Sequence, residues 1–230
     1  MASAVFSTYK RDQVEQAIGI VSGNIRPSQT PGAFNRIKIE LKRLLDRDRK
    51  QAQETPKGAP VRQAFHSAPP PGRGIDVIYT AYEAFALLTA LRLMRAGLPQ
   101  STAVRFLRDL REPLAGFHYE TLQLSLQQLR PDIEQGERLR LVRDGFLVRS
   151  VEQMAYLMAL ADERAEQFDL PSPPEAPVSG NICRSLDQLH DRLRWASHEG
   201  CPLIVVELVN AAHQLAYHLS QIPARPRGRS

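Results

Sequence analysis

Residues Gly72–Arg111 read GRGIDVIYTAYEAFALLTALRLMRAGLPQSTAVRFLRDLR, and this run predicts one strand followed by two helices. Three β-branched residues favour a short strand at its start: Ile75, Val77 and Ile78. Thr80 and Glu83 stand three residues apart, which is the spacing of a capping box. In that motif each side chain accepts a hydrogen bond from the other residue's backbone N–H. We therefore expect a helix to begin at Thr80.

The end of this helix and the start of the next are also marked in the sequence. Gly97 can take the left-handed backbone conformation that closes a helix. Leu98 and Pro99 then begin a second, shorter helix. On the N-terminal side, residues 9–22 and 33–50 predict two more helices, separated by a loop with two glycines and two prolines. The helix over 33–50 has the clearest core-facing stripe, formed by Phe34, Ile37, Leu41, Leu44 and Leu45.

The order of elements over residues 9–111 resembles the MerR-type winged helix-turn-helix domain. The likeness is strongest over IYTAYEAFALLTALRLMRAGLPQSTAVRFLRDLR, where tyrosine, cap, long helix, Ala-Gly and short helix follow the spacing of the family's second helix pair. The resemblance implies binding of double-stranded DNA by a homodimer and a role in transcription control. It also implies that the DNA contacts come from the helix at 33–50 and from a wing, here the proline-rich residues 51–74.

The helix at 33–50 carries the side chains that such an interface needs. Candidate contacts, from the side chains facing away from its apolar stripe, are Asn35, Arg36, Lys38, Lys42 and Arg43. Arginine forms paired hydrogen bonds to guanine, and lysine neutralises phosphate. Arg73 is the candidate contact from the wing, with Lys57 and Arg62 nearby. An alternative is a solvated helix face balanced by acids, for example through a Lys42–Asp46 pair, with the wing cations serving solubility.

The charge is divided unevenly along the chain. Residues 1–120 hold 18 Lys and Arg against 11 Asp and Glu, whereas residues 121–230 hold 12 against 14. A basic first half and a slightly acidic second half suggest that a polyanion is bound by the first half.

The second half predicts a smaller α+β module. We expect a helix over 116–129, a β-hairpin around Asp144-Gly145, helices over 151–168, 182–196 and 208–221, and a buried strand beside the hairpin at Leu203–Val206. The predicted fold class is therefore mainly α (α+β). The predicted domains are 1–115 for DNA binding, 116–222 for dimerisation or signal input, and 223–230 as a basic disordered tail.

Several other classes of protein are not favoured. No apolar run approaches the roughly 20 residues that cross a bilayer, and no secretory signal is recognisable, so we expect a cytoplasmic protein without a membrane partner. Glycine-rich phosphate loops are absent, and no catalytic constellation is evident, so we do not expect an enzyme. The main alternative to DNA binding is a protein-interaction module that uses the helix at 80–96 and the hairpin.

Cysteine and histidine residues near the C-terminal end do not match a metal site. Cys183, His190, His198 and Cys201 lie close in sequence, but their spacing fits no zinc finger or ribbon. Cys183 and His190 would lie two turns apart on one helix face, which simple packing explains. We expect no metal and no cofactor, and both thiols to be reduced.

Overall fold

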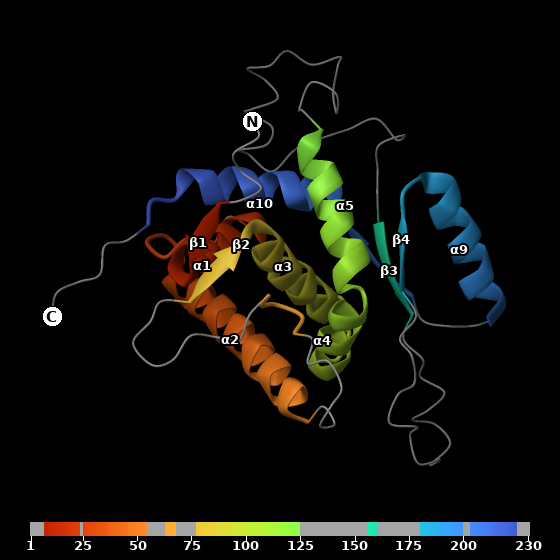
Figure 1. The fold of residues 1–230 in the computed structure, drawn as a ribbon, viewed down its shortest axis with the longest axis horizontal. Coiled ribbons are helices and arrows are strands. Elements are labelled where there is room, and N and C mark those ends of the chain that lie inside the picture. The colour runs from red at the N-terminus through yellow and green to blue at the C-terminus, as the bar shows by residue number, and fades with distance from the viewer. Residues whose placement is uncertain are drawn as a thin grey trace, which may run out of the picture.

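A computed structural model describes residues 7–23, 25–54, 63–67, 77–124, 156–160, 180–199 and 203–224. This part of the chain is mainly helical and holds two small antiparallel sheets, in agreement with the predicted fold class (Figure 1). The first half runs in the order β1 (Thr8–Lys10), α1 (Arg11–Val21), α2 (Pro31–Gln53), β2 (Ile78–Thr80), α3 (Ala81–Arg95), α4 (Gln100–Asp109) and α5 (Arg111–Gln123).

Strands β1 and β2 join two similar units. They pair antiparallel with Tyr9 opposite Tyr79, and both tyrosines are buried. Each strand runs directly into a helix whose first turn is closed by a side chain. The Gln13 side chain accepts from the Lys10 backbone N–H at 3.0 Å, and the Glu83 carboxylate accepts from Thr80 N–H at 2.7 Å. The ladder thus holds two strand–helix–helix units together, although β1 was not predicted.

The local signals around α3 are confirmed. Thr80 Oγ1 accepts from Glu83 N–H at 3.2 Å, which completes the predicted capping box. Gly97 has a φ of 106°, the left-handed conformation expected after the end of α3. α2 differs from the prediction at both ends, because it begins at Pro31 and continues to Gln53. Proline suits a first helical position, since its φ is preset and no N–H is left without a partner.

A glycine fixes the turn between α1 and α2. Ile25 N–H donates to the Gly19 carbonyl at 3.0 Å, so the chain folds back over the end of α1. A Cβ at Gly19 would lie 2.6 Å from the Ile25 carbonyl oxygen, a distance that real Cβ atoms do not tolerate. Glycine at this position therefore sets the direction in which the chain leaves α1 toward α2.

Helix α10 (Val209–Gln221) lies across α1, α3 and α5 (Figure 1). Leu215 and Leu219 on α10 belong to the same apolar core as Ile18 on α1 and Leu88 on α3. The core therefore crosses the predicted boundary at residues 115/116, while the division into domains stays a prediction.

The second sheet corrects the predicted helix over 151–168. Its strand order is β4 (Gly180–Cys183), β3 (Tyr156–Leu160) and β5 (Leu203–Glu207), with β3 antiparallel to both neighbours. The run from Leu157 to Leu160 is apolar throughout, and a short apolar run does not distinguish a strand from a helix. Pairing on both sides decides in favour of the strand.

The predicted helix at 182–196 is also wrong at its start. Residues up to Cys183 form β4, and α9 (Leu186–Glu199) follows. Cys183 and His190 therefore do not share a helix face. The strand at Leu203–Val206 is confirmed, but it pairs with β3, and Val205 is 39% exposed rather than buried. The predicted hairpin around Asp144-Gly145 lies outside the described residues, as does the tail from residue 225.

Candidate functional site

The five candidate DNA contacts on α2 lie on its exposed side. The opposite side of this helix is buried against α1, α3 and α4 through Phe34, Ile37, Leu41, Leu44 and Asp48. The exposed candidates are Asn35, Arg36, Lys38, Lys42 and Arg43. The fold thus brings these five together on one accessible helix face. The remaining candidate, Arg73, lies outside the described residues.

The helical repeat arranges this exposed face in three strips. With 3.6 residues per turn, residues seven apart lie almost directly above one another. One edge carries Lys38, Lys42 and Arg49, and the other edge carries Arg36, Arg43 and Lys50. Between the two basic edges runs a central strip formed by Asn35, Ile39 and Asp46. Ile39 is 51% exposed, so this strip presents one apolar side chain between the two basic edges.

The acidic residues of α2 do not neutralise most of these cations. Glu40 pairs with Arg95 of α3 at 3.1 Å, and the buried Asp48 pairs with Arg108 of α4 at 2.6 Å. Asp46 lies 3.8 Å from Arg49 rather than pairing with Lys42.

Among the described residues, no carboxylate lies within ion-pair distance of four of the predicted contacts, Arg36, Lys38, Lys42 and Arg43. Their charge is therefore available to an external anion.

A described part of the predicted wing lies on the other side of α2. The segment Gln63–Ser67 contacts the body of the protein, and its residues Ala64 and Phe65 are fully buried. The Asp48 carboxylate accepts from Ala64 N–H at 3.0 Å and from Phe65 N–H at 3.2 Å. This segment is thus bound to the buried face of α2, away from the exposed cations.

Glu83 binds the far end of the 63–67 segment, and Arg111 binds both of its ends. The buried Glu83 carboxylate accepts from the backbone N–H of Ser67 and from its hydroxyl at 2.8 Å. Arg111 donates to the carbonyl oxygens of Gln63 and Ala64 and to Ser67 Oγ, the last at 2.9 Å. Sequence reasoning missed this arrangement. The available signal was Asp48, a carboxylate on the apolar stripe of an amphipathic helix.

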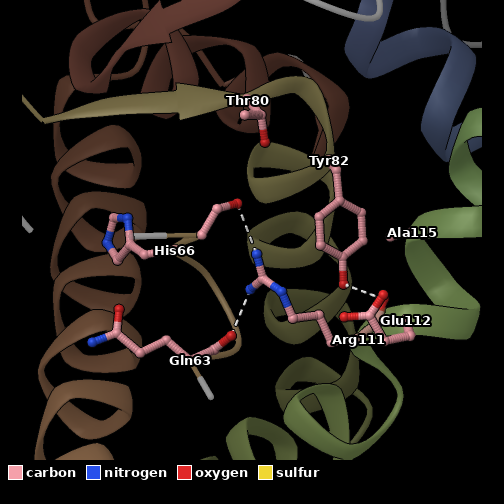
Figure 2. A pocket seen from close by; sticks show the side chains of 8 residues that line it. Gln63, His66, Thr80, Tyr82, Arg111, Glu112 and Ala115 are labelled. Atoms are coloured by element: carbon pink, nitrogen blue, oxygen red, sulfur yellow. Dashed lines mark hydrogen bonds between the residues drawn. The ribbon is translucent and has the colours of Figure 1, made fainter. Parts of the chain in front are cut away.

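A cavity of about 480 Å³ opens beside Arg111. It is formed by three regions far apart in sequence, and its lining residues are Gln63, His66, Ser67, Thr80, Tyr82, Arg111, Glu112 and Ala115. Figure 2 shows the Arg111 side chain reaching from α5 into the space between the 63–67 segment and Tyr82. Its guanidinium group lies 5.5 Å from the centre of the Tyr82 ring. A second cavity of about 180 Å³ shares three of these residues: Thr80, Tyr82 and Ala115.

The titratable groups around the cavities are mostly uncharged. Burial lowers the pKa of His66, although the Glu83 carboxylate acts in the opposite direction. Burial also raises the pKa of Tyr82, which lines both cavities, and it raises to about 12 the pKa of Tyr79, which packs against the His66 ring but lines neither cavity. The histidine and both tyrosines therefore stay neutral near pH 7. Arg111 is the cation of the larger cavity, and the exposed Glu112 is its carboxylate.

No three histidine, cysteine or acidic side chains of the described residues are grouped as a metal site requires. Cys183 is buried at the end of β4, whereas His190 is exposed on α9. Cys201 lies outside the described residues. The arrangement around α9 therefore gives no argument for a metal centre.

No family model, curated protein or solved structure matches this chain. In the described part of the chain, no helix has both the length and the apolar character that a membrane span requires. The function is therefore argued from the geometry of α2 and of the cavity.

Proposed function

We propose that this protein binds double-stranded DNA through the exposed face of α2 and regulates transcription in the cytoplasm. The observation that carries the proposal is the pair of basic edges on α2, whose cations mostly have no acidic partner among the described residues. A surface of this kind attracts polyanions, because each bound phosphate releases condensed counterions from the DNA.

The three strips on α2 fit the cross-section of a major groove. The groove admits one α-helix, with a sugar–phosphate backbone on either side and base edges at its floor. Lys38 and Lys42 on one edge and Arg36 and Arg43 on the other would then bind the two backbones. The central strip would face the bases.

Two residues of the central strip are suited to reading A·T base pairs. The Asn35 amide can donate to and accept from one adenine, and the exposed Ile39 can contact a thymine methyl group. An apolar side chain that is 51% exposed gains stability when it leaves water for such a contact.

The fold supports the same proposal. The resemblance implies two helices, a wing, a short strand and two further helices, and α1, α2, β2, α3 and α4 follow that order, with β1 as an additional strand before α1. The buried side of α2 packs against α1, α3 and α4, so the exposed face is presented on a rigid element. We therefore propose a MerR-like regulator that contacts DNA through α2 and acts as a homodimer, and in which the described part of the predicted wing, residues 63–67, supports the buried side of α2 instead of contacting DNA.

A titration of the protein with duplex DNA at two salt concentrations tests the proposal. We expect binding at low salt and a steep loss at higher salt, with a slope of about 0.9 per neutralised phosphate. Replacing Arg36, Lys38, Lys42 and Arg43 together by alanine should abolish binding and flatten this slope.

A matched pair of double variants controls for general loss of charge. Lys42→Ala with Arg43→Ala removes two cations from α2, and Arg192→Ala with Arg194→Ala removes two exposed cations from α9. Only the first pair should weaken binding. Absence of binding at low salt, or binding that salt does not affect, contradicts the proposal.

The alternative function is a protein-interaction module without DNA contact. The surface predicted for it on the helix at 80–96 is buried, because α3 lies in the core, and the predicted hairpin lies outside the described residues. The alternative is instead favoured by β5, which is an edge strand in the described part of the second sheet and exposes Val205. Exposed strand edges are common sites of pairing with another chain. Light scattering of the purified protein, with and without a Val205→Lys substitution, tests self-association through this edge. Absence of DNA binding at low salt then separates this alternative from the proposed homodimeric DNA-binding protein.

A further inference from the structure

We infer that the cavity beside Arg111 binds a small monocarboxylic acid with an aromatic body, its carboxylate on Arg111 and its ring in the neighbouring smaller cavity. This inference goes beyond DNA binding and does not depend on it. The volume of about 480 Å³ lies within the range of roughly 300–1,000 Å³ that is typical of small-molecule sites.

The hydrogen bonding of Arg111 indicates the charge of the ligand. A guanidinium group has five N–H donors. Three of them have acceptors among the described residues, namely the carbonyl oxygens of Gln63 and Ala64 and the Ser67 hydroxyl. No carboxylate of the described residues lies within ion-pair distance of Arg111. Its charge and its two other donors therefore suit an incoming carboxylate, which guanidinium binds in paired, charge-assisted hydrogen bonds.

A second charged residue of the lining, Glu112, limits the negative charge that the ligand can carry. Glu112 follows Arg111 on α5, is exposed and lines the same cavity. Its negative charge disfavours phosphate and other anions with more than one charge, because like charges in close proximity repel. A monoanion avoids most of this cost.

The lining of the second cavity indicates that the uncharged part of the ligand is an aromatic ring. It shares Thr80, Tyr82 and Ala115 with the first, so the two spaces adjoin. Its remaining lining is mostly apolar or aromatic: Ala81, His118, Tyr119 and Leu122. Burial lowers the pKa of His118 to about 4, so this imidazole is neutral near pH 7. A planar ring placed here would contact Tyr82 and Tyr119, and aromatic pairs gain stability beyond area burial.

Thermal unfolding of the full chain in the absence of DNA tests the inference. Benzoate should raise Tm saturably, because a ligand that binds the folded state alone stabilises it. Benzamide has the same shape without charge, benzylamine is a cation, and acetate lacks the ring. Each of these three should bind at least tenfold more weakly than benzoate, as measured by calorimetric titration.

Two neighbouring substitutions on α5 locate the site. Ala115→Leu fills the wall shared by the two cavities and leaves every polar group of Arg111, Ser67 and Glu83 in place. Gly116→Ala is the matched control, since a Cβ at this exposed glycine meets no atom within 4 Å. Affinity for benzoate should fall at least tenfold in the first variant and stay unchanged in the second.

Three results would overturn the inference. The first is that Tm shows no saturable shift up to roughly 10 mM benzoate, a concentration tenfold above a Kd of 1 mM. The second is equal binding of acetate and benzoate. The third is unchanged benzoate affinity in a folded Ala115→Leu protein. All measurements omit DNA, so a failure of the DNA-binding proposal would appear separately in the salt titration.

Discussion

His118 is buried between α5 and the core, and its environment makes stability depend on pH. The imidazole is 5% exposed and stacks on the Phe85 ring at 4.7 Å between centres. Burial, with a smaller contribution from His213, lowers its pKa from 6.5 to about 4. The unfolded chain therefore binds more protons than the folded protein between these values. The resulting stability is fully present above pH 6.5 and is lost as the pH falls toward 4.

We predict that this histidine alone reduces the free energy of unfolding by about 2.5 kcal/mol between pH 7 and pH 4.5. Urea unfolding at the two pH values measures the loss. His118→Phe keeps an aromatic ring without a titrating group. The same change of pH should therefore lower its free energy of unfolding by about 2.5 kcal/mol less than that of the wild-type protein. An equal loss in both proteins would mean that other groups cause the pH dependence.

Ile39 offers a second test at a single residue. If it contacts a thymine methyl group, Ile39→Ala should weaken binding to a site selected by the wild-type protein several-fold. Replacing thymidine by deoxyuridine in that site should weaken the wild-type protein and leave Ile39→Ala unaffected, since the contact is already absent. Competitive mobility shifts measure both effects. Lys38→Ala serves as comparison, because a phosphate contact is lost on every sequence alike.

At the scale of the elements, α2 is stabilised by the ion pair between its buried Asp48 and Arg108 of α4. The exposed cations of α2 take no part in this pair. Asp48 is 1% exposed and binds both Arg108 and the 63–67 segment. Asp48→Ala should cost about 3–5 kcal/mol of unfolding free energy, because it leaves a buried cation and two backbone N–H groups without their acceptor. Asp46→Ala, two residues away and exposed, should cost less than about 1 kcal/mol.

Chemical denaturation compares these two variants directly. A similar small cost for both would show that the 63–67 segment contributes little to stability. A large cost for Asp46→Ala would instead place a structural partner on the exposed face and weaken the argument for DNA contact there.

The elements also show how far sequence reasoning reaches. The capping box of α3 and its ending at Gly97 were predictable, because both depend on residues a few positions apart. The strand β3 was not, because its apolar run suits a helix equally well until β4 and β5 pair with it. The exposed face of α2 followed from its periodicity. The docking of Phe65 under Asp48 depends on contacts between distant residues, which a periodic pattern does not encode.

On the scale of the whole molecule, α10 completes the core of the first half. Leu215 is 1% exposed and lies in one cluster with residues of α1, α3 and α5. Leu215→Ala should therefore lower the free energy of unfolding by about 2–5 kcal/mol. The destabilisation should extend from α10 to α1 and α3, because they share one core. Hydrogen exchange should show that amides of α1 and α3 lose protection together with those of α10. Two separate unfolding transitions would instead favour independent domains divided at residues 115/116.

The Gln13 side chain on α1 donates to the carbonyl of Ile222, directly after α10, at 2.6 Å and across 209 positions of sequence. A ribosome adding about 5–20 residues per second needs roughly 10–40 s to make the chain between these two residues. Throughout that interval the part of α1 that packs against α10 has no partner, although α2 and α3 can already cover the rest. The order of synthesis therefore means that the core which α1 and α3 share with Leu215 and Leu219 closes only when α10, the last described helix, has been made.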